Sequence, residues 1–221
     1  MKLSTNATFL ENRFYHVFNR TNNREPLFLA DNHFNFFLKR YQSYLGGFVD
    51  TYSYALLSNH FHLSIKVKSV EEILVYVLSL NNQNRTKPIR NFLSLDDKSA
   101  SIHSLISSQF RRFFISYTQV FNKITSRKGN LLNRPFKRSL VDDDSKFAYL
   151  QYYIHHNARK HKLVANFTDY PYTSYQILLS DKPTFLNREF VYEWFGSREA
   201  FIKFHEASHY EEKFSDIDIE D

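Results

Sequence analysis

Two histidines one residue apart are the first side chains whose type and spacing could do chemistry. His60 and His62 lie in an apolar, strand-like run with Phe61 between them. Alternate side chains of a strand leave the same face of a sheet, so both imidazoles face the same way. Such a pair can bind a divalent metal ion. The pattern is short and common, so two surface histidines at the start of a strand are the other interpretation.

A tyrosine and an asparagine four residues apart form the second group. Tyr153 and Asn157 lie in a predicted helix over residues 145–159 and therefore share one helical face. A phenol can attack a phosphorus atom, and an amide oxygen can serve as a ligand for magnesium or manganese. A tyrosine on an apolar helix is also common in core packing, so this segment alone leaves both roles open.

Basic residues precede the tyrosine helix and are interleaved with an aromatic ring. Arg127 and Lys128 form a basic turn, and residues 134–138 follow with three cations around Pro135 and Phe136. Such a stretch can neutralise backbone phosphates near a nucleophile. A solvated basic loop would have the same composition, and the stretch alone does not separate the two interpretations.

The net charge favours a polyanionic partner. The chain has 221 residues and a formal charge of +6. Residues 211–221 hold six acidic residues and one lysine, so residues 1–210 carry 28 basic and 17 acidic residues, a charge of +11. Aromatic residues make up 18% of the chain, and exposed rings could stack on unpaired bases. Nucleic acid is therefore the partner class to test first.

Cysteine is absent, which excludes disulfides, thiolate metal sites and thiol nucleophiles. This composition fits a cytoplasmic location. The N-terminal residues have no long apolar run, so we expect no secretory signal, and no segment is long and apolar enough to predict a membrane partner. With only four glycines, a phosphate-cradling glycine-rich loop is not expected either.

The elements that must position these groups follow a simple order. Alternation and composition predict strands at residues 14–19, 48–57, 60–67 and 136–141. Helical spacing predicts helices at 31–45, 69–80 and 102–124, with Asp31 as an N-cap and Ser69 and Glu72 as a capping box. This order predicts an α+β fold, a ferredoxin-like antiparallel sheet with helices on one face. The tyrosine helix would be an addition to that unit.

The rest of the chain predicts three further features. Residues 81–100 are polar and rich in asparagine, which indicates a loop or insertion. Residues 1–179 form the expected main domain, followed by a C-terminal helical extension over 180–210. The acidic tail over 211–221 is expected to be disordered.

Four segments in this order resemble the single-tyrosine HUH transposases, in particular the branch of REP-associated tyrosine transposases. Together they lie within residues 13–176, and the combination is far more specific than any one segment. The segments are Tyr15–Arg20 with Asn22–Arg24, then Tyr54–Leu63, then Asn133–Arg138, and finally Tyr153–Asn157 continuing to Asp169–Tyr175.

This resemblance implies a DNA-nicking and strand-transfer enzyme that acts on single-stranded or hairpin DNA as a monomer or homodimer. It implies that His60, His62 and Asn157 hold magnesium or manganese, and that Tyr153 forms a 5′-phosphotyrosine. The candidate DNA contacts are the basic residues of the matching segments and the turn before them: Arg20, Arg24, Arg127, Lys128, Arg134, Lys137 and Arg138.

Two departures and three alternatives accompany the resemblance. The family usually has proline where Ser58 and Ala158 stand here, although neither change removes a chemical group from the site. A non-catalytic module for single-stranded nucleic acid would not need the histidines and the tyrosine to converge, whereas an inactive transposase descendant would keep the fold and could keep the site. A hydrolase with a water nucleophile would need the histidines only, and a structural protein would need neither.

Overall fold

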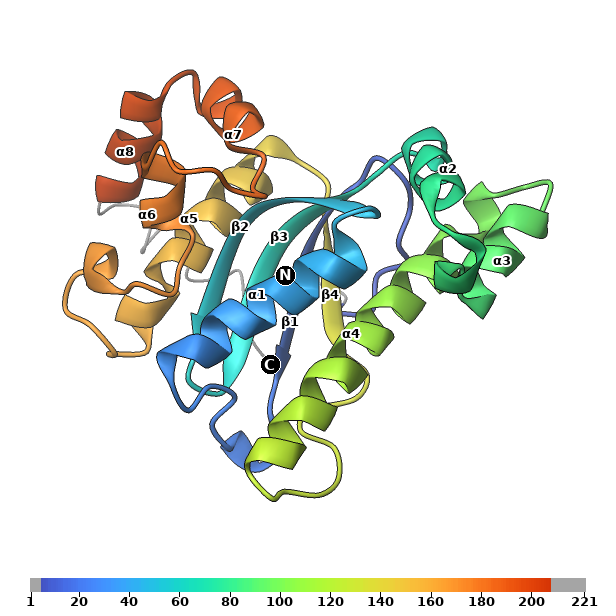
Figure 1. Cartoon of the computed structure of the whole chain (residues 1–221). Helices are drawn as coiled ribbons and strands as arrows, with labels where there is room; N and C mark the ends of the chain where they lie inside the picture. The colour runs from blue at the N-terminus through green and yellow to red at the C-terminus, as the bar shows by residue number, and fades with distance from the viewer. Residues whose placement is uncertain (1–4, 208–221) are drawn as a thin grey trace.

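A four-stranded antiparallel sheet forms the centre of the molecule in a computed structural model that describes residues 5–207. Its strands are β1 (Phe14–Arg20), β2 (Val49–Leu57), β3 (His60–Val67) and β4 (Lys137–Val141). They lie in the order β2-β3-β1-β4, with helices between β1 and β2 and between β3 and β4 (Figure 1). This is a ferredoxin-like arrangement, so the predicted α+β fold is confirmed.

The register of the strands sorts their side chains onto two faces. Phe18 of β1 pairs with His62 of β3, and Val17 pairs with Leu63. Paired residues of antiparallel strands share a face, so Phe18 and His62 lie on one side of the sheet and Val17 and Leu63 on the other. We call these sides the α5 face and the α4 face, after the helices that cover them.

The α4 face is covered by two long helices, as Figure 1 shows: α1 (Asp31–Leu45) and α4 (Ile102–Ile124). Aromatic rings fill the space between these layers. The ring of Phe37 lies 5.1 Å from that of Phe61 on β3 and 4.9 Å from that of Phe113 on α4, between ring centroids. All three rings are buried, and burying one such ring contributes about 1.5–3 kcal/mol. The apolar spacing that predicted both helices therefore marks the main core.

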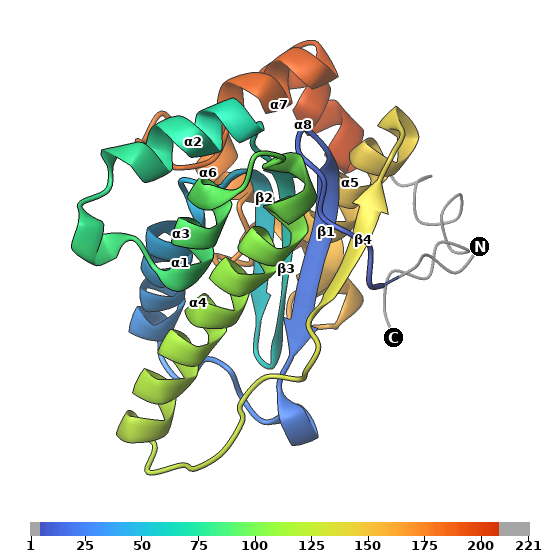
Figure 2. The same cartoon turned by 90° about the vertical axis from the view of Figure 1, so that its right-hand side faces the viewer.

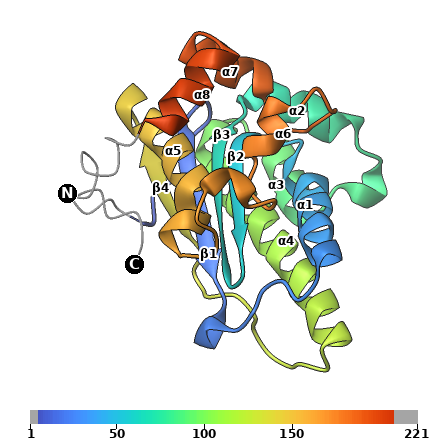
Figure 3. The same cartoon turned by 90° about the vertical axis from the view of Figure 1, so that its left-hand side faces the viewer.

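The α5 face is covered by the predicted tyrosine helix, α5 (Asp144–Lys160), seen in front of the sheet in Figure 3. Asp143 is its N-cap, and the Asp143 carboxylate accepts a hydrogen bond of 2.7 Å from the backbone N–H of Lys146. The amide of Gln151 donates to the hydroxyl of Ser64 on β3 at 2.9 Å, and both residues are buried. The cap and this hydrogen bond fix where the helix lies along the sheet.

Two short helices lie between β3 and α4. The first, α2 (Val70–Ser79), begins with the predicted capping box of Ser69 and Glu72. The second, α3 (Lys87–Ser94), corrects the prediction of a loop over residues 81–100. It has a proline in its first turn and buries Ile89 and Phe92, which lie three residues apart. Two apolar residues in a polar segment are too few to show helical spacing in the sequence.

Both ends of α1 depend on small details of the sequence. The predicted N-cap is wrong by one residue, because Ala30 is the N-cap and Asp31 is the first helical residue. The carboxylate of Asp31 instead accepts a hydrogen bond from the hydroxyl of Tyr172. The helix ends at Leu45 as predicted, with Gly46 as its C-cap. Gly47 packs against Tyr76, whose ring would lie 2.1 Å from an added Cβ. The residue at position 47 must therefore be a glycine unless Tyr76 moves.

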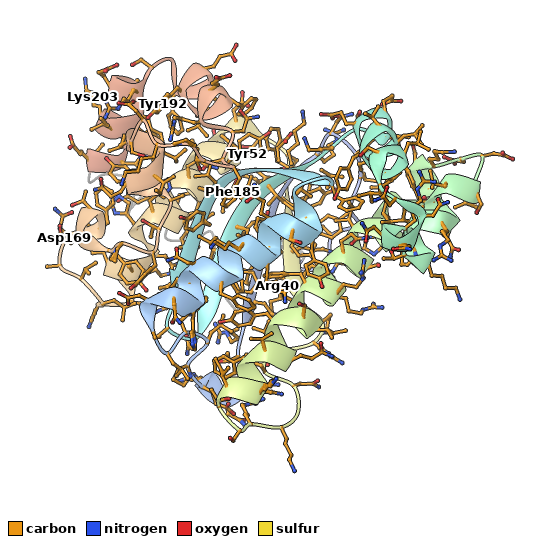
Figure 4. All side chains as sticks on the ribbon, in the orientation of Figure 1. Arg40, Tyr52, Asp169, Phe185, Tyr192 and Lys203 are labelled. Atoms are coloured by element: carbon orange, nitrogen blue, oxygen red, sulfur yellow. The ribbon has the colours of Figure 1, made fainter. Side chains whose placement is uncertain are left out.

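Three helices follow α5: α6 (Tyr175–Leu179), α7 (Arg188–Phe195) and α8 (Arg198–Glu206). The chain around them covers the outer edge of β2 through backbone bridges at Thr173 and Leu186, while Asn6 bridges to β4 at the opposite edge. Phe185, labelled in Figure 4, stacks on Tyr54 with 6.2 Å between ring centroids. Covered edges protect the sheet from pairing with other chains.

Short 3-10 turns complete the described chain, and the acidic tail predicted at 211–221 lies outside it. The turns are η1 (Asn22–Arg24), η2 (Asn82–Asn84), η3 (Ser99–Ser101) and η4 (Phe167–Asp169). No helix within residues 5–207 has both the length and the apolar character needed to cross a membrane.

Candidate active site

The two histidines of the His-x-His pattern lie at the start of β3, immediately after the tight turn that joins it to β2. His62 pairs with Phe18 and His60 pairs with Arg20, so both imidazoles leave the α5 face of the sheet. Their ring centroids are 5.2 Å apart. His62 is buried and His60 is partly exposed, which places the pair at the rim of the space between sheet and helix.

A third histidine, His16 on β1, completes this group. Its Nε2 lies 2.9 Å from Nδ1 of His62, and both side chains are buried. His16 also stacks on Phe18, with ring centroids 4.5 Å apart. The sequence places His16 in a strand but assigns it no role, because its neighbour His62 is 46 residues away. The signal lies in the strand register, which makes His16 and His62 diagonal neighbours on one face.

Helix α5 brings the predicted nucleophile to the same place. The ring of Tyr153 lies 5.4 Å from that of His62 and 6.0 Å from that of His16, between centroids. One turn later, Oδ1 of Asn157 lies 3.3 Å from Nε2 of His60. Tyr153 and Asn157 are both buried beneath the helix. The helix and the strand therefore bring together the four residues predicted to act together.

The proton of His60 can be assigned from its neighbour. Its Nδ1 lies 2.7 Å from Oδ1 of Asn59 and its Nε2 lies 3.3 Å from Oδ1 of Asn157, and both oxygens can only accept. The single hydrogen of a neutral ring is assigned to Nδ1, because that contact is the shorter one. The lone pair of the ring is then on Nε2, which faces the amide oxygen of Asn157. Two electron-pair donors that face each other are a fitting arrangement for a cation.

The set of metal-binding groups at this site is small. Across residues 5–207, no three or more His, Cys, Asp or Glu side chains form a group arranged to hold a metal ion. A site here would need the amide oxygen of Asn157 beside the nitrogens of His60 and His62. Such a mixed nitrogen and oxygen set lacks a carboxylate, so it would carry no negative charge of its own.

Two further side chains border the candidate site, Lys160 beside Tyr153 and His161 beside His60, and sequence reasoning did not single them out. The ammonium nitrogen of Lys160 lies 5.0 Å from the ring centroid of Tyr153. The ring of His161 lies 4.8 Å from that of His60. Both follow Asn157 at the end of α5, where helical spacing returns residues to the same side. A cation here would stabilise negative charge on the phenol oxygen or on a phosphate.

The predicted DNA contacts do not form one surface. Lys137 pairs with Phe18 and its ammonium lies 5.9 Å from that ring, so it faces the histidines, as Arg20 does through its pairing with His60. Arg138 pairs with Val17 and therefore faces the opposite side of the sheet. The basic run at the start of β4 is thus divided between the two faces.

The other predicted contacts lie in the connections between elements. Arg127 pairs with Glu25 through a 2.5 Å contact, and this guanidinium holds the pKa of the carboxyl below its usual range. Arg127 also donates to the backbone oxygen of Asn130 at 3.0 Å, so it ties two loops together. Arg24, Lys128 and Arg134 are exposed.

Histidines of α5 that point away from the site form a buried chain. Nδ1 of His205 lies 2.8 Å from the backbone oxygen of Phe201 and must donate to it. Nε2 of His205 then accepts from Nδ1 of His155 at 2.8 Å, and Nε2 of His155 accepts from the hydroxyl of Ser174, also at 2.8 Å. Nε2 of His156 donates to the backbone oxygen of His205 at 2.9 Å. These contacts join α8 to α5.

Burial keeps this chain neutral. Desolvation lowers the pKa of His156 to about 3 and that of His205 to about 4, and the pKa of His155 also lies well below its usual value for the same reason. The three rings are therefore structural groups that hold the back of the tyrosine helix.

Comparison with known proteins finds similarity at the level of the fold. No family model matches the chain, and no curated protein sequence matches it. Among solved structures, a REP-associated tyrosine transposase bound to a REP hairpin aligns with a TM-score of 0.53 and 14% sequence identity, over 83% of this chain and 89% of that one. The ferredoxin-like sheet with its added tyrosine helix is thus distantly similar in structure to a transposase of that kind.

Proposed function

We propose that this chain is a metal-dependent enzyme that nicks single-stranded or hairpin DNA and transfers the strand through a 5′-phosphotyrosine. The observation that carries the proposal is the meeting of Tyr153 and Asn157 on α5 with His60 and His62 on β3. These residues come from segments about 90 positions apart, and a packing role alone does not require a phenol, an amide and two imidazoles at one rim.

The reaction is a displacement at phosphorus. The phenol oxygen of Tyr153 forms a bond to phosphorus, and the bond from phosphorus to the 3′-oxygen breaks. The phenol loses its proton to solvent or a nearby base, and the departing 3′-oxygen takes up a proton to become a hydroxyl. A later attack by a 3′-hydroxyl on the phosphotyrosine reverses these changes and joins a new strand. The energy of the broken phosphodiester is kept, so no nucleotide cofactor is required.

His60, His62 and Asn157 would hold a magnesium or manganese ion, which would neutralise the phosphate and stabilise the leaving oxygen. The residues of this chain do the rest. Lys160 attracts the phosphate to the side of Tyr153, where its ammonium lies 5.0 Å from the ring centroid. Lys137 and Arg20 border the same face and would contact flanking phosphates.

DNA is the partner that the charge and the structural neighbour favour. The structural neighbour was solved with a REP hairpin. In this chain, the basic side chains of Lys137, Arg20 and Lys160 surround the candidate site. We therefore propose a DNA hairpin or a single strand as substrate in the cytoplasm, with the enzyme acting as a monomer or homodimer. Binding through phosphates predicts an affinity that falls steeply with salt.

The test is an adduct assay with end-labelled hairpin DNA and manganese or magnesium, resolved on a denaturing gel. We expect a labelled protein–DNA adduct that disappears in Tyr153→Phe and on chelation. The matched control is Tyr152→Phe, which removes a hydroxyl from the same helix on the side that stacks on His156. Cleavage without an adduct that persists in Tyr153→Phe would assign the reaction to a water nucleophile. Binding without cleavage would assign the chain to the non-catalytic modules.

A further inference from the structure

A cavity of about 490 Å³ lies on the α4 face, away from the tyrosine. One wall is a strip of α4, in which His103, Ser107 and Arg111 follow one another at intervals of one helical turn. The other wall is the segment that returns from α4 to β4, which Figure 2 shows running back along the sheet. This volume lies in the range of roughly 300–1,000 Å³ that is usual for small-molecule sites.

The polar groups of the cavity are mainly donors. Nδ1 of His103 accepts a hydrogen bond of 3.1 Å from the backbone N–H of Phe9, so Nε2 of the neutral ring carries the hydrogen. Burial lowers the pKa of His103, which favours that neutral ring. The hydroxyl of Ser107 is buried, with no hydrogen-bond partner within the described chain. A ligand rich in acceptor oxygens would satisfy both groups.

Positive charge at the cavity is not neutralised by acidic residues of the lining. Arg111, Arg134 and Arg138 line it, and no aspartate or glutamate among the described residues does so. Arg138 is held in place, because its Nε donates to the backbone oxygen of Ala7 at 2.6 Å and its guanidinium lies 5.2 Å from the ring centroid of Phe136. Arg111 and Arg134 are exposed at the rim and could close on an anion.

Apolar surface completes the lining. Phe114 and Ile115 of α4 face the cavity from one side, and Pro135 and Phe136 face it from the other. Rings beside guanidinium groups are the combination that proteins use for unpaired nucleotides, with cations on the phosphate and apolar faces against the base. A duplex would not fit, because its bases are paired and stacked inside.

We infer that this cavity binds one unpaired nucleotide of a single-stranded DNA arm, as a second nucleic-acid site on the face opposite Tyr153. Arg111 and Arg134 contact its phosphate, the hydroxyl of Ser107 and Nε2–H of His103 donate to its oxygens, and the base lies against Phe114. The inference rests on the proposed DNA function and adds a place for the part of the substrate that is not being cut.

The end of β1 connects this cavity with the candidate active site. Arg20 pairs with His60 on the α5 face, and the backbone oxygen of Arg20 accepts a hydrogen bond of 2.9 Å from the backbone N–H of Asn133. Asn133 is followed by Arg134 at the rim of the cavity. A strand leaving the histidines would therefore meet Arg20 and then Arg134 as it passes round the end of the sheet.

The experiment compares two fluorescein-labelled hairpins, one blunt and one with an unpaired oligothymidine arm of about 12 nucleotides. Binding of the full chain is followed by anisotropy as a function of salt. The variants are Arg111→Gln, which removes an exposed cation, and Ser107→Leu, which fills the cavity. Lys203→Gln is the control for charge, because Lys203 is an exposed residue of α8, far from α4 (Figure 4). Thermal unfolding verifies that each variant is folded.

We expect Arg111→Gln and Ser107→Leu to bind the armed hairpin roughly five- to tenfold more weakly, with the salt slope of Arg111→Gln reduced by about one. Binding of the blunt hairpin and the behaviour of Lys203→Gln should not change. If both variants bind the armed hairpin as the wild type does while the tyrosine adduct still forms, the cavity proposal is wrong and the proposed function stands. If the wild type binds neither hairpin and forms no adduct, both fail together.

Discussion

Nε2 of His16 lies 2.9 Å from Nδ1 of His62, so the strand beside the His-x-His strand contacts one of the two candidate ligands directly. Both rings are buried, and they lie nearly parallel, at 18° with 5.1 Å between centroids. A histidine that binds a metal through one nitrogen is usually oriented by a hydrogen bond at the other. In the proposed metal site, His16 would therefore position His62.

Replacing His16 tests this relationship. We expect His16→Leu to bind manganese roughly 10–100-fold more weakly, because the ring of His62 loses the partner that fixes its tautomer and orientation. His16→Gln keeps a polar group at the same distance along the side chain and should recover part of the affinity. Manganese titration by calorimetry or electron paramagnetic resonance measures both. Equal affinity for His16→Leu and wild type would show that His16 only fills space.

Asn157→Asp tests the amide oxygen that faces His60. The position is fully buried, so a carboxylate there is costly without a cation and favourable with one. We expect Asn157→Asp to unfold at a lower temperature than wild type in chelator, and to gain more from added manganese, with an affinity on the order of tenfold higher. Asn157→Leu, of similar size, should lose the manganese response. A manganese response of the same size in both variants would exclude position 157 from the metal site.

Lys137 and Arg127 separate two kinds of predicted DNA contact. Lys137 faces the histidines from β4, whereas Arg127 holds Glu25 and the backbone oxygen of Asn130. We expect Lys137→Gln to weaken hairpin binding and to reduce the salt slope by about one, with little change in unfolding temperature. Arg127→Gln should lower the unfolding temperature and leave the salt slope of hairpin binding nearly unchanged, because it releases Glu25 and loosens two loops. Hairpin titrations at several salt concentrations and thermal unfolding distinguish the two variants. A reduced salt slope in Arg127→Gln would show that Arg127 contacts DNA.

Local patterns in the sequence were enough to predict most of the fold. The helix over 102–124 and the capping box at Ser69 follow from spacing and composition alone, and the structure has both. The helix at 87–94 does not, because only Ile89 and Phe92 are buried in it. Its stability comes from packing on α4, which a local pattern does not contain.

The candidate site divides in the same way. His60 and His62 share a face because they lie two residues apart in a strand, and Tyr153 and Asn157 share a face because they lie four residues apart in a helix. The contact between His16 and His62 depends on strand pairing, and the separation of Lys137 from Arg138 follows from alternation along β4. Alternation was available in the sequence, but which face belongs to the tyrosine is decided by where α5 packs. The chain from Ser174 through His155 to His205 joins residues far apart and needs the tertiary structure.

The buried hydrogen-bonded histidines make the stability of the protein depend on pH in a defined direction. His156 and His205 have folded pKa values of about 3 and about 4, below the unfolded value of about 6.5. The unfolded protein therefore binds protons first as the pH falls, and stability is full above about pH 6.5 and decreases from there toward about pH 3, the folded pKa of His156. Each histidine contributes a slope of at most about 1.4 kcal/mol per pH unit in that window. The hydrogen-bond partners of the rings are neutral: a hydroxyl, backbone oxygens and one another. The one charged neighbour among the causes of these shifts, Arg159, lowers the pKa of His156 further and so acts in the same direction.

Urea unfolding across that pH window measures the slope, and one variant assigns it. His205→Leu removes one titrating ring and leaves an apolar side chain against Phe201, whose ring centroid lies 4.2 Å from that of His205. We expect this variant to be less stable than wild type at neutral pH, because Nδ1–H of His155 loses its partner, but to lose less stability as the pH falls. His33→Gln, at a partly exposed position on α1, is the control and should keep the wild-type slope. If His205→Leu leaves the pH dependence of stability unchanged, the titrating groups lie outside the buried histidine network.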